Sequence, residues 1–302
     1  MKNNEKFKGI FTALLTPFTE EGKVDVTAIE QLVEYNIRKG ISGFYVGGST
    51  GEVFLLRPEE RRIVYEICAM AAKGKCTLIA HIGDLSTEKA IEYAKLCEQL
   101  GYDAVSSVTP FYYKYSKEEL VKYYLDIADA VDLPVLMYCI PALSGVAVGF
   151  DVFDRLLSDS RFLGVKFTGN DFFTFERLRK KYPDKILYNG YDEMFLCGMA
   201  MGADGAIGST YNLMAEKFIA MRQLCEEGKY AQAREIQHEA NEIIADLVEN
   251  GNVNGALKYA LTDLVGINMG ICRKPLTDMP ENWKMKFDRK YAGKFEKYYT
   301  CV

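Results

Sequence analysis

Eight short apolar segments alternate with amphipathic segments along most of the 302-residue chain, and this alternation limits the folds open to it. A short run of nearly continuous apolar residues is typical of a parallel strand that is covered on both faces. The intervening segments repeat apolar residues at helical spacing. We therefore expect buried strands at residues 9–15, 43–46, 77–81, 104–108, 135–138, 164–167, 186–188 and 205–207.

Helix-start signals fall between these strands. Asp25 precedes apolar residues at helical spacing and is expected to cap a helix that Gly40 ends. Pro58 suits the first turn of the next helix. Ser116 and Glu119 form a capping box before a further apolar stripe. Strand and helix signals thus alternate as a βα repeat requires.

Eight strand–helix units predict an α/β fold, a (β/α)8 TIM barrel, although a doubly wound open sheet has a similar linear pattern. An α/β barrel of roughly 250 residues forms a single domain. We assign residues 1–226 to the barrel, as the catalytic domain. Residues 227–302 are predicted to be helical only, and we expect them to form a C-terminal helical extension packed on the barrel.

Charge and composition exclude several classes of partner. The formal net charge of −5 and the pI near 5.4 give no basic stripe for nucleic acid. No segment approaches the roughly 20 apolar residues that span a membrane, and residues 1–8 lack the apolar stretch of a signal peptide. With only His81 and His238 in the chain, a zinc site built on histidines is not expected.

The eight cysteines are scattered, with no CxxC pair or zinc-ligand spacing. Most of them lie among apolar neighbours. This distribution favours buried thiols in a reducing compartment, and we expect a cytoplasmic protein.

Lys166 interrupts an apolar segment, FLGVKF at residues 162–167. A buried lysine costs stability unless it is paired or neutral. Burial lowers the pKa of a lysine, and the neutral amine is the nucleophile that condenses with a ketone. On this segment alone, a strand-end lysine that reaches solvent or pairs with an acid is the simpler explanation.

Tyr138 ends the preceding predicted strand, VLMY at residues 135–138. The carboxyl ends of barrel strands converge on one face, where active sites form. Because Tyr138 and Lys166 end adjacent strands, we expect their side chains to meet there, where a phenol can carry protons to and from substrate oxygen. A tyrosine at such a position is more often a packing residue, so Tyr138 alone does not decide the function.

The motif GGSTGE at residues 47–52 directly follows the second predicted strand. Glycines allow a tight turn in which consecutive N–H groups form an anion nest, and a substrate carboxylate fits such a nest. A Walker phosphate loop would need Gly-Lys-Ser/Thr at its end, which is missing here. A purely structural glycine turn explains the motif equally well when it is taken alone.

The motif NGYDE at residues 189–193 follows the seventh predicted strand. Adjacent carboxylates on a βα loop can accept hydrogen bonds from several hydroxyl groups, as a sugar-like substrate needs. The same acids can also stabilise the start of a helix, and the two interpretations are compatible. A divalent metal site is less favoured, because no third oxygen ligand is evident nearby.

Together these motifs resemble the N-acetylneuraminate lyase and dihydrodipicolinate synthase superfamily of pyruvate-dependent aldolases, from about Phe7 to Pro275. Besides GGSTGE, the resemblance rests on VTPFYY at 108–113, IPALSG at 140–145, YNGYDE at 188–193 and ADGAIGSTYN at 203–212. The lyase branch is the closer match. The synthase branch carries arginine at the position of Leu143 and tends to carry threonine at the position of Ser49.

The resemblance implies a role for each matching position. Lys166 is implied to form the Schiff base, and Tyr138 to transfer the proton at the cleaved bond. Ser49 and Tyr112 are implied relay partners, with Tyr112 reaching across a subunit interface, while Ser49 and Thr50 hold the substrate carboxylate. The positions implied to contact the polyhydroxyl tail of the substrate are Thr168, Gly190, Asp192, Glu193 and Ser209.

The activity implied is reversible cleavage of N-acetylneuraminate, a sialic acid, to pyruvate and N-acetylmannosamine. The resemblance implies no cofactor, no metal and a homotetramer assembled as a dimer of dimers. Another pyruvate-dependent aldolase or synthase stays open as an alternative, as does a non-catalytic sugar-acid-binding regulator.

Three positions depart from the family pattern. Cys139 replaces an asparagine and is expected to change packing more than chemistry. Asn254 stands where some lyases have an aromatic residue, and Lys114 stands where proline is common. Because of these two departures, the resemblance does not determine the contacts at the rim of the site.

Overall fold

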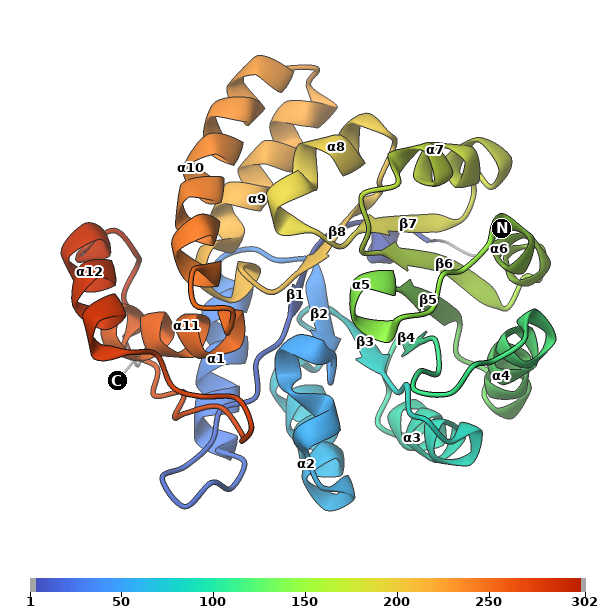
Figure 1. Ribbon diagram of the computed structural model, residues 1–302, viewed down its shortest axis with the longest axis horizontal. Coiled ribbons are helices and arrows are strands. Elements are labelled where there is room, and N and C mark those ends of the chain that lie inside the picture. The colour runs from blue at the N-terminus through green and yellow to red at the C-terminus, as the bar shows by residue number, and fades with distance from the viewer. Residues whose placement is uncertain (1–3, 300–302) are drawn as a thin grey trace.

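A computed structural model describes residues 4–299 as eight parallel strands that close into a barrel (Figure 1). Each strand pairs with its sequence neighbours, and β1 pairs with β8 to close the sheet. This confirms the (β/α)8 prediction over the open sheet. The strands are β1 Gly9–Ala13, β2 Gly43–Val46, β3 Thr77–His81, β4 Ala104–Val108, β5 Val135–Cys139, β6 Phe162–Phe167, β7 Ile186–Asn189 and β8 Gly205–Gly208.

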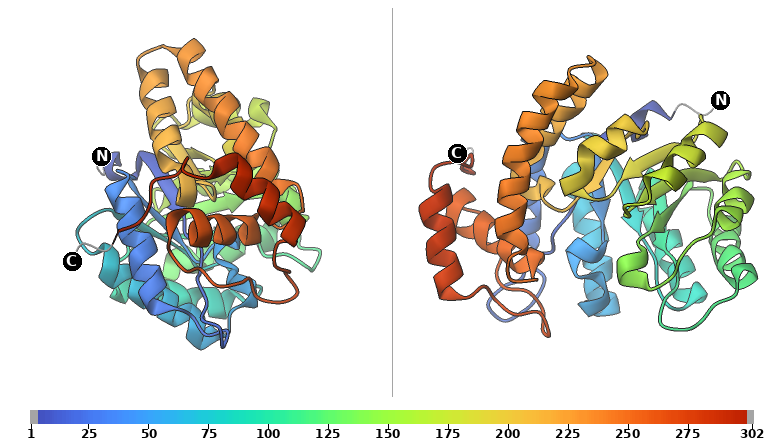
Figure 2. Two further views of the ribbon diagram at one scale, coloured as in Figure 1. Left: turned by 90° about the vertical axis from the view of Figure 1, so that its left-hand side faces the viewer. Right: turned by 45° about the horizontal axis from the view of Figure 1, so that its top comes forward.

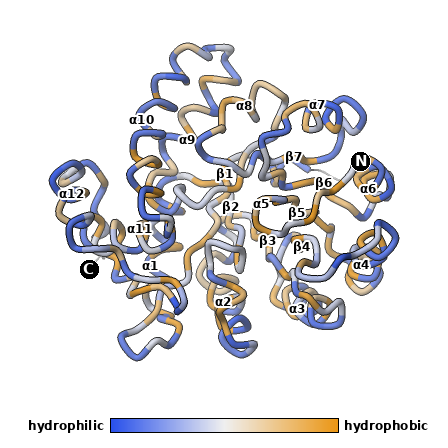
Figure 3. Tube along the Cα trace, viewed as in Figure 1, coloured by the Kyte–Doolittle hydropathy of each residue, from blue (hydrophilic) through white to orange (hydrophobic). Residues whose placement is uncertain are grey.

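The strands are buried on both faces because side chains alternate between two apolar layers. In β5, Leu136 and Tyr138 belong to a cluster inside the barrel, whereas Met137 and Cys139 belong to the larger cluster beneath the helices. Figure 3 shows apolar strands surrounded by helices whose other faces are hydrophilic. Cys139 therefore packs against the surrounding helices rather than in the barrel interior.

The barrel helices follow their strands in order. Asp25 caps α1 by accepting from Ala28 N at 3.0 Å, and Ser116 and Glu119 form the expected capping box of α4. Pro58 is the first residue of α2, as predicted. The barrel helices are α1 Val26–Arg38, α2 Pro58–Ala72, α3 Thr87–Gln99, α4 Lys117–Ala130, α6 Phe150–Leu157, α7 Phe172–Lys181, α8 Phe195–Ala200 and α9 Tyr211–Glu226.

Short helical turns lie at the carboxyl ends of several strands. They are η2 Ser49–Gly51, η3 Val53–Leu55, α5 Pro141–Ser144 and η4 Asp192–Met194. These turns follow β2, β5 and β7, so they surround the face of the barrel where Tyr138 and Lys166 end their strands.

The C-terminal segment is helical, and Figure 2 shows it along one flank of the barrel. It consists of α10 Tyr230–Val248, α11 Val253–Ala260, the π-helical turn η5 Leu261–Val265 and α12 Glu281–Tyr291. In α10, Gln237 Nε2 donates to the carbonyl of Asp192 at 3.1 Å and so supports a loop at the barrel mouth. The division of the chain at residue 226 stays a prediction.

The thiols between residues 4 and 299 are free, and most are buried. Cys76 is half-buried, and Cys197 on α8 is exposed. Burial raises the pKa of the Cys76 thiol to about 11. Cys301 lies outside the described residues. In the same part of the chain, no helix has both the length and the apolar character needed to cross a bilayer.

Candidate active site

Lys166 and Tyr138 lie side by side at the carboxyl ends of β6 and β5. The strand register pairs the two residues directly. The Lys166 Nζ lies 4.0 Å from the centre of the Tyr138 ring and 4.3 Å from the centre of the Tyr45 ring. Lys166 is only 5% exposed, so its amine is enclosed by aromatic faces at the inner end of the barrel mouth.

Burial determines the protonation of this amine. Loss of hydration lowers the pKa of Lys166 to about 7, although the Asp192 carboxylate opposes the change. Near neutral pH a large fraction of the amine is therefore uncharged. Since only the neutral amine is nucleophilic, Lys166 is chemically competent to attack a carbonyl carbon.

The Tyr138 phenol is buried beside two hydroxyl groups. Burial raises its pKa to about 12, while the hydroxyls of Ser49 and Thr168 oppose the rise. The Thr168 hydroxyl is itself buried and has no partner of standard hydrogen-bond geometry among the described residues. Tyr138 is therefore protonated at neutral pH and adjoins groups that can exchange a proton with it.

The GGSTGE motif forms the turn that carries Ser49 and Thr50. Gly47 has a φ of +74°, which favours glycine, and a Cβ on Gly48 would lie 2.9 Å from the Tyr45 ring. The N–H groups of Ser49 and Thr50 have no acceptor within residues 4–299. Two neighbouring free donors and two hydroxyls make this turn suitable for a carboxylate.

Asp192 and Glu193 begin η4, as a helix-start interpretation predicts, but they differ in environment. Asp192 is buried, and its Oδ2 accepts from the N–H and the hydroxyl of Thr210 at 2.9 and 2.7 Å. Its Oδ1 is buried near the Tyr211 hydroxyl, without a partner of standard hydrogen-bond geometry among the described residues. Burial raises the pKa of Asp192 to about 6. Glu193 is exposed at the rim.

The other residues implied to contact the polyhydroxyl tail of the substrate lie on the loops after β6, β7 and β8. Thr168 is buried, whereas Gly190 and Ser209 are half-buried. A Cβ on Gly190 would lie 1.8 Å from the Thr168 hydroxyl, so the close approach of these two loops requires glycine. The loops thus place both buried and accessible polar groups above Lys166.

Tyr112 lies apart from this group within one copy of the chain. It is 83% exposed, has a φ of +79° and packs edge-on against Tyr113 at 5.1 Å between ring centres. Beside Ser49, a cavity of about 300 Å³ is lined mainly by apolar residues, including Phe54, Phe111, Ile140 and Leu143.

Tyr45 and His81 also lie at the site, although no motif in the sequence marked either of them as a site residue. Tyr45 packs on Lys166, and its hydroxyl shares a hydrogen bond with Ser106 at 3.0 Å. The His81 Nε2 accepts from Val108 N at 3.2 Å, so the other ring nitrogen carries the proton and donates to the carbonyl of Gly47 at 2.9 Å. Burial lowers the pKa of His81 to about 3, so it stays neutral.

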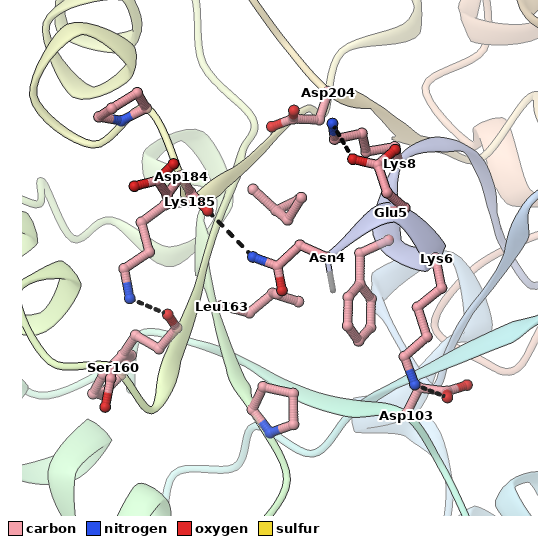
Figure 4. A pocket seen from close by; sticks show the side chains of 15 residues that line it. Asn4, Glu5, Lys6, Lys8, Asp103, Ser160, Leu163, Asp184, Lys185 and Asp204 are labelled. Carbon is pink, nitrogen blue, oxygen red and sulfur yellow. Dashed lines mark hydrogen bonds and ion pairs between the residues drawn. The ribbon is translucent and has the colours of Figure 1, made fainter. Parts of the chain in front are cut away.

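A cavity of about 730 Å³, whose lining side chains are drawn in Figure 4, opens at the opposite end of the barrel, where the strands begin. Two ion pairs lie in its lining, Lys6 with Asp103 and Lys8 with Glu5, while Lys185 donates to backbone carbonyls (Figure 4). The reactive lysine is absent from its lining, and barrel enzymes use the other face. Among the described residues, no group of three or more His, Cys, Asp or Glu side chains is arranged to hold a metal ion.

Comparison with known proteins shows which family the chain resembles along most of its length. Residues 6–292 match the dihydrodipicolinate synthetase family. N-acetylneuraminate lyases from Citrobacter koseri and Salmonella typhimurium are 43% and 44% identical to the chain over 277 residues, which cover 91% of this chain and 93% of each relative.

Solved structures give the same result. A Clostridium difficile protein, CdNal, crystallised with mannosamine, is 39% identical with a TM-score of 0.91, covering 94% of this chain and 99% of its own. A Ruminococcus gnavus sialic acid aldolase with a mutated catalytic lysine is 31% identical with a TM-score of 0.93, covering 96% of each chain. From the match along residues 6–292 and these full-length relatives, we conclude that the chain belongs to the dihydrodipicolinate synthetase family.

Proposed function

We propose that the protein is a class I aldolase that reversibly cleaves N-acetylneuraminate to pyruvate and N-acetylmannosamine. The observation that carries this proposal is the buried, largely neutral amine of Lys166 against the ring of Tyr138. The names of the relatives, N-acetylneuraminate lyase and sialic acid aldolase, support the choice of substrate.

In the cleavage direction, neutral Lys166 attacks the ketone carbon of the open-chain sugar acid, and loss of water gives a protonated imine. The carbon–carbon bond then breaks while its electron pair flows into the imine. Tyr138 oxygen takes the proton of the neighbouring substrate hydroxyl as its own proton moves to Ser49, and Ser49 releases its hydroxyl proton to solvent, a relay favoured by the proximity of Tyr138 and Ser49. The imine is the electron sink, so the proposed chemistry calls for no cofactor.

The resulting enamine is protonated at carbon to give the pyruvate imine. Water then hydrolyses this imine, which releases pyruvate and restores the Lys166 amine. We assign the substrate carboxylate to Ser49 and Thr50, whose N–H groups are free. For the polyhydroxyl tail we assign Thr168, Gly190, Asp192, Glu193 and Ser209.

Leu143 favours the lyase over the synthase reaction. It is 69% exposed on α5 beside the mouth cavity, and an apolar side chain cannot pair with the second carboxylate of a synthase substrate. A panel of aldehydes offered with pyruvate distinguishes the two reactions, because a synthase would prefer an aldehyde that bears a carboxylate.

We further propose a cytoplasmic homotetramer in which Tyr112 enters the site of a neighbouring copy. The exposure of Tyr112 and the open apolar cavity beside Ser49 support this assembly. Light scattering should give four times the chain mass. A monomer that cleaves the sugar acid at full rate would contradict the proposal.

Borohydride reduction in the presence of pyruvate tests the chemistry. Reduction converts an imine into a stable amine, so peptide mapping should find a pyruvate-derived adduct on Lys166. The Lys166→Ala variant should carry none at any lysine. An adduct elsewhere, or no adduct in the folded wild type, would overturn the proposed function.

A further inference from the structure

The C-terminal helix α11 contacts the carboxylate-binding turn at two points. Asn254 and Lys258 are four residues apart and so share one face of α11. The Lys258 Nζ pairs with Glu52 Oε1 at 2.6 Å, and Asn254 Nδ2 approaches the carbonyl of Ser49 at 3.4 Å. One helix face thus reaches the first and last residues of the segment Ser49–Glu52.

The Glu52–Lys258 pair is among the most deeply buried ion pairs of the described chain. The side chains are 0% and 1% exposed. The second carboxylate oxygen of Glu52 accepts from the N–H of Arg273 at 2.7 Å, and the Lys258 amine lies 4.1 Å from the centre of the Phe18 ring. Burying two charges is costly, and their separation leaves an uncompensated charge in the interior. The pair therefore fixes the Glu52 side chain in one place.

Because its side chain is fixed, the backbone of Glu52 is also held in one conformation. Its φ and ψ of 57° and 31° are left-handed, a conformation that residues other than glycine seldom adopt. This residue ends η2, in which Ser49 and Thr50 present their free N–H groups. The Gly51 carbonyl is held separately, by the Thr16 hydroxyl at 2.8 Å.

We propose that Glu52 and Lys258 are positioning residues for the substrate carboxylate, so that the C-terminal helices set the affinity of the barrel for keto acids. This inference rests on the proposed function. Neither side chain touches the reacting atoms. Together they hold the turn whose N–H groups bind the carboxylate, so we expect imine formation on Lys166 with a ketone that has no carboxylate to be unaffected by their loss.

The test compares a keto acid with its ester. The double variant Glu52→Gln, Lys258→Met removes both charges, so no unpaired charge stays buried. We measure borohydride trapping on Lys166 against the concentration of pyruvate and of methyl pyruvate, which lacks the carboxylate. The half-saturating concentration of pyruvate should rise roughly tenfold or more, because small misplacements of binding groups are costly. The value for methyl pyruvate should not change.

A second variant and a control complete the experiment. Glu52→Asp keeps both charges and shortens the tether by one methylene, so it should also weaken pyruvate binding while the fold is retained. Lys39→Met removes another buried lysine, one that pairs with Glu216 and lies outside the turn, and should leave both half-saturating concentrations unchanged.

The outcomes separate the two proposals. Folded variants that bind pyruvate like the wild type would overturn the positioning role. Equal weakening for pyruvate and methyl pyruvate would overturn it too, since that result indicates general damage to the site. Failure of the wild type to form any Lys166 adduct would instead overturn the proposed function.

Discussion

Burial of Lys166 lowers the free energy of unfolding by an amount that depends on pH. Its pKa of about 7 lies below the ordinary value of 10.5, so between these values the unfolded chain holds a proton that the folded chain lacks. Stability therefore rises with pH across this window, and the cost is greatest below it. Lys166→Met should raise the free energy of unfolding by about 3 kcal/mol at pH 8.

Urea denaturation at several pH values checks this prediction. The gain of the Lys166→Met variant should shrink as the pH approaches 10.5, where the lysine is neutral in both states. A gain that does not depend on pH would show that packing, rather than charge burial, causes it.

Tyr138→Phe separates imine formation from bond cleavage. The variant should still form a pyruvate adduct on Lys166, but cleavage of N-acetylneuraminate should slow by about 10²–10⁴-fold, because the proton acceptor is lost. Steady-state kinetics measures the cleavage rate, and borohydride trapping measures adduct formation. Tyr45→Phe is the matched control, since the Tyr45 hydroxyl bonds to Ser106. Equal effects of the two changes would contradict a special role of Tyr138.

Lysine and tyrosine at strand ends were recognisable in the sequence because each interrupts or ends an apolar run. Tyr45 and His81 were not, although both face the same site. An aromatic residue inside a strand and a histidine at its end look like ordinary core residues. Their place at the site depends on the closed barrel, which brings Tyr45 on β2 and His81 on β3 close to the residues of β5 and β6.

At the scale of elements, Gly208 on β8 controls the place of Asp192. A Cβ at this position would lie 1.8 Å from Asp192 Oδ1 and 2.5 Å from the Tyr211 ring. Gly208→Ala should therefore push the carboxylate off Thr210, with a loss of about 1–3 kcal/mol in stability. The KM for the sugar acid should rise more than the half-saturating concentration of pyruvate.

Steady-state kinetics and adduct trapping check this difference. Thr210→Ser keeps the hydroxyl that Asp192 accepts from and should behave like the wild type. An equal loss of affinity for sugar acid and pyruvate in Gly208→Ala would count against a role of Asp192 in binding the tail.

The strands were predictable to within one or two residues because both of their faces are apolar. β1 is shorter than predicted and ends at Ala13, while β6 starts earlier, at Phe162. The acids of η4 indicated a helix start in the sequence, but the helical form of η2 and the detailed shape of both turns were not predictable. Their shape depends on partners far away in sequence, as Glu52 on Lys258 and Asp192 on Thr210.

At the scale of the whole molecule, Glu60 joins α2 to the segment after η5. Its carboxylate accepts from the Arg273 side chain at 2.6 and 3.1 Å and from Arg57 at 3.0 Å. Burial alone would raise the pKa of Glu60, but these hydrogen bonds lower it to about 2. This contribution to stability is present above pH 4.5 and is lost as the pH falls towards 2.

Glu60→Gln should therefore lower the free energy of unfolding by about 2 kcal/mol at pH 7. The difference from the wild type should vanish in acid. Thermal denaturation between pH 2 and 7 measures it. Glu59→Gln is the control, because the Glu59–Arg57 pair is exposed and contributes little. A constant difference at all pH values would contradict this account of Glu60.

The exposed thiol on α8 offers a site for a fluorescent label that reports ligand binding. Cys197 comes four residues after Glu193, about one helical turn away, whereas the other thiols of residues 4–299 are at least half-buried. Once Cys301 is replaced by serine, a maleimide dye would attach at this single point. Its fluorescence would then follow the arrival and departure of sugar acids in real time, without a coupled assay.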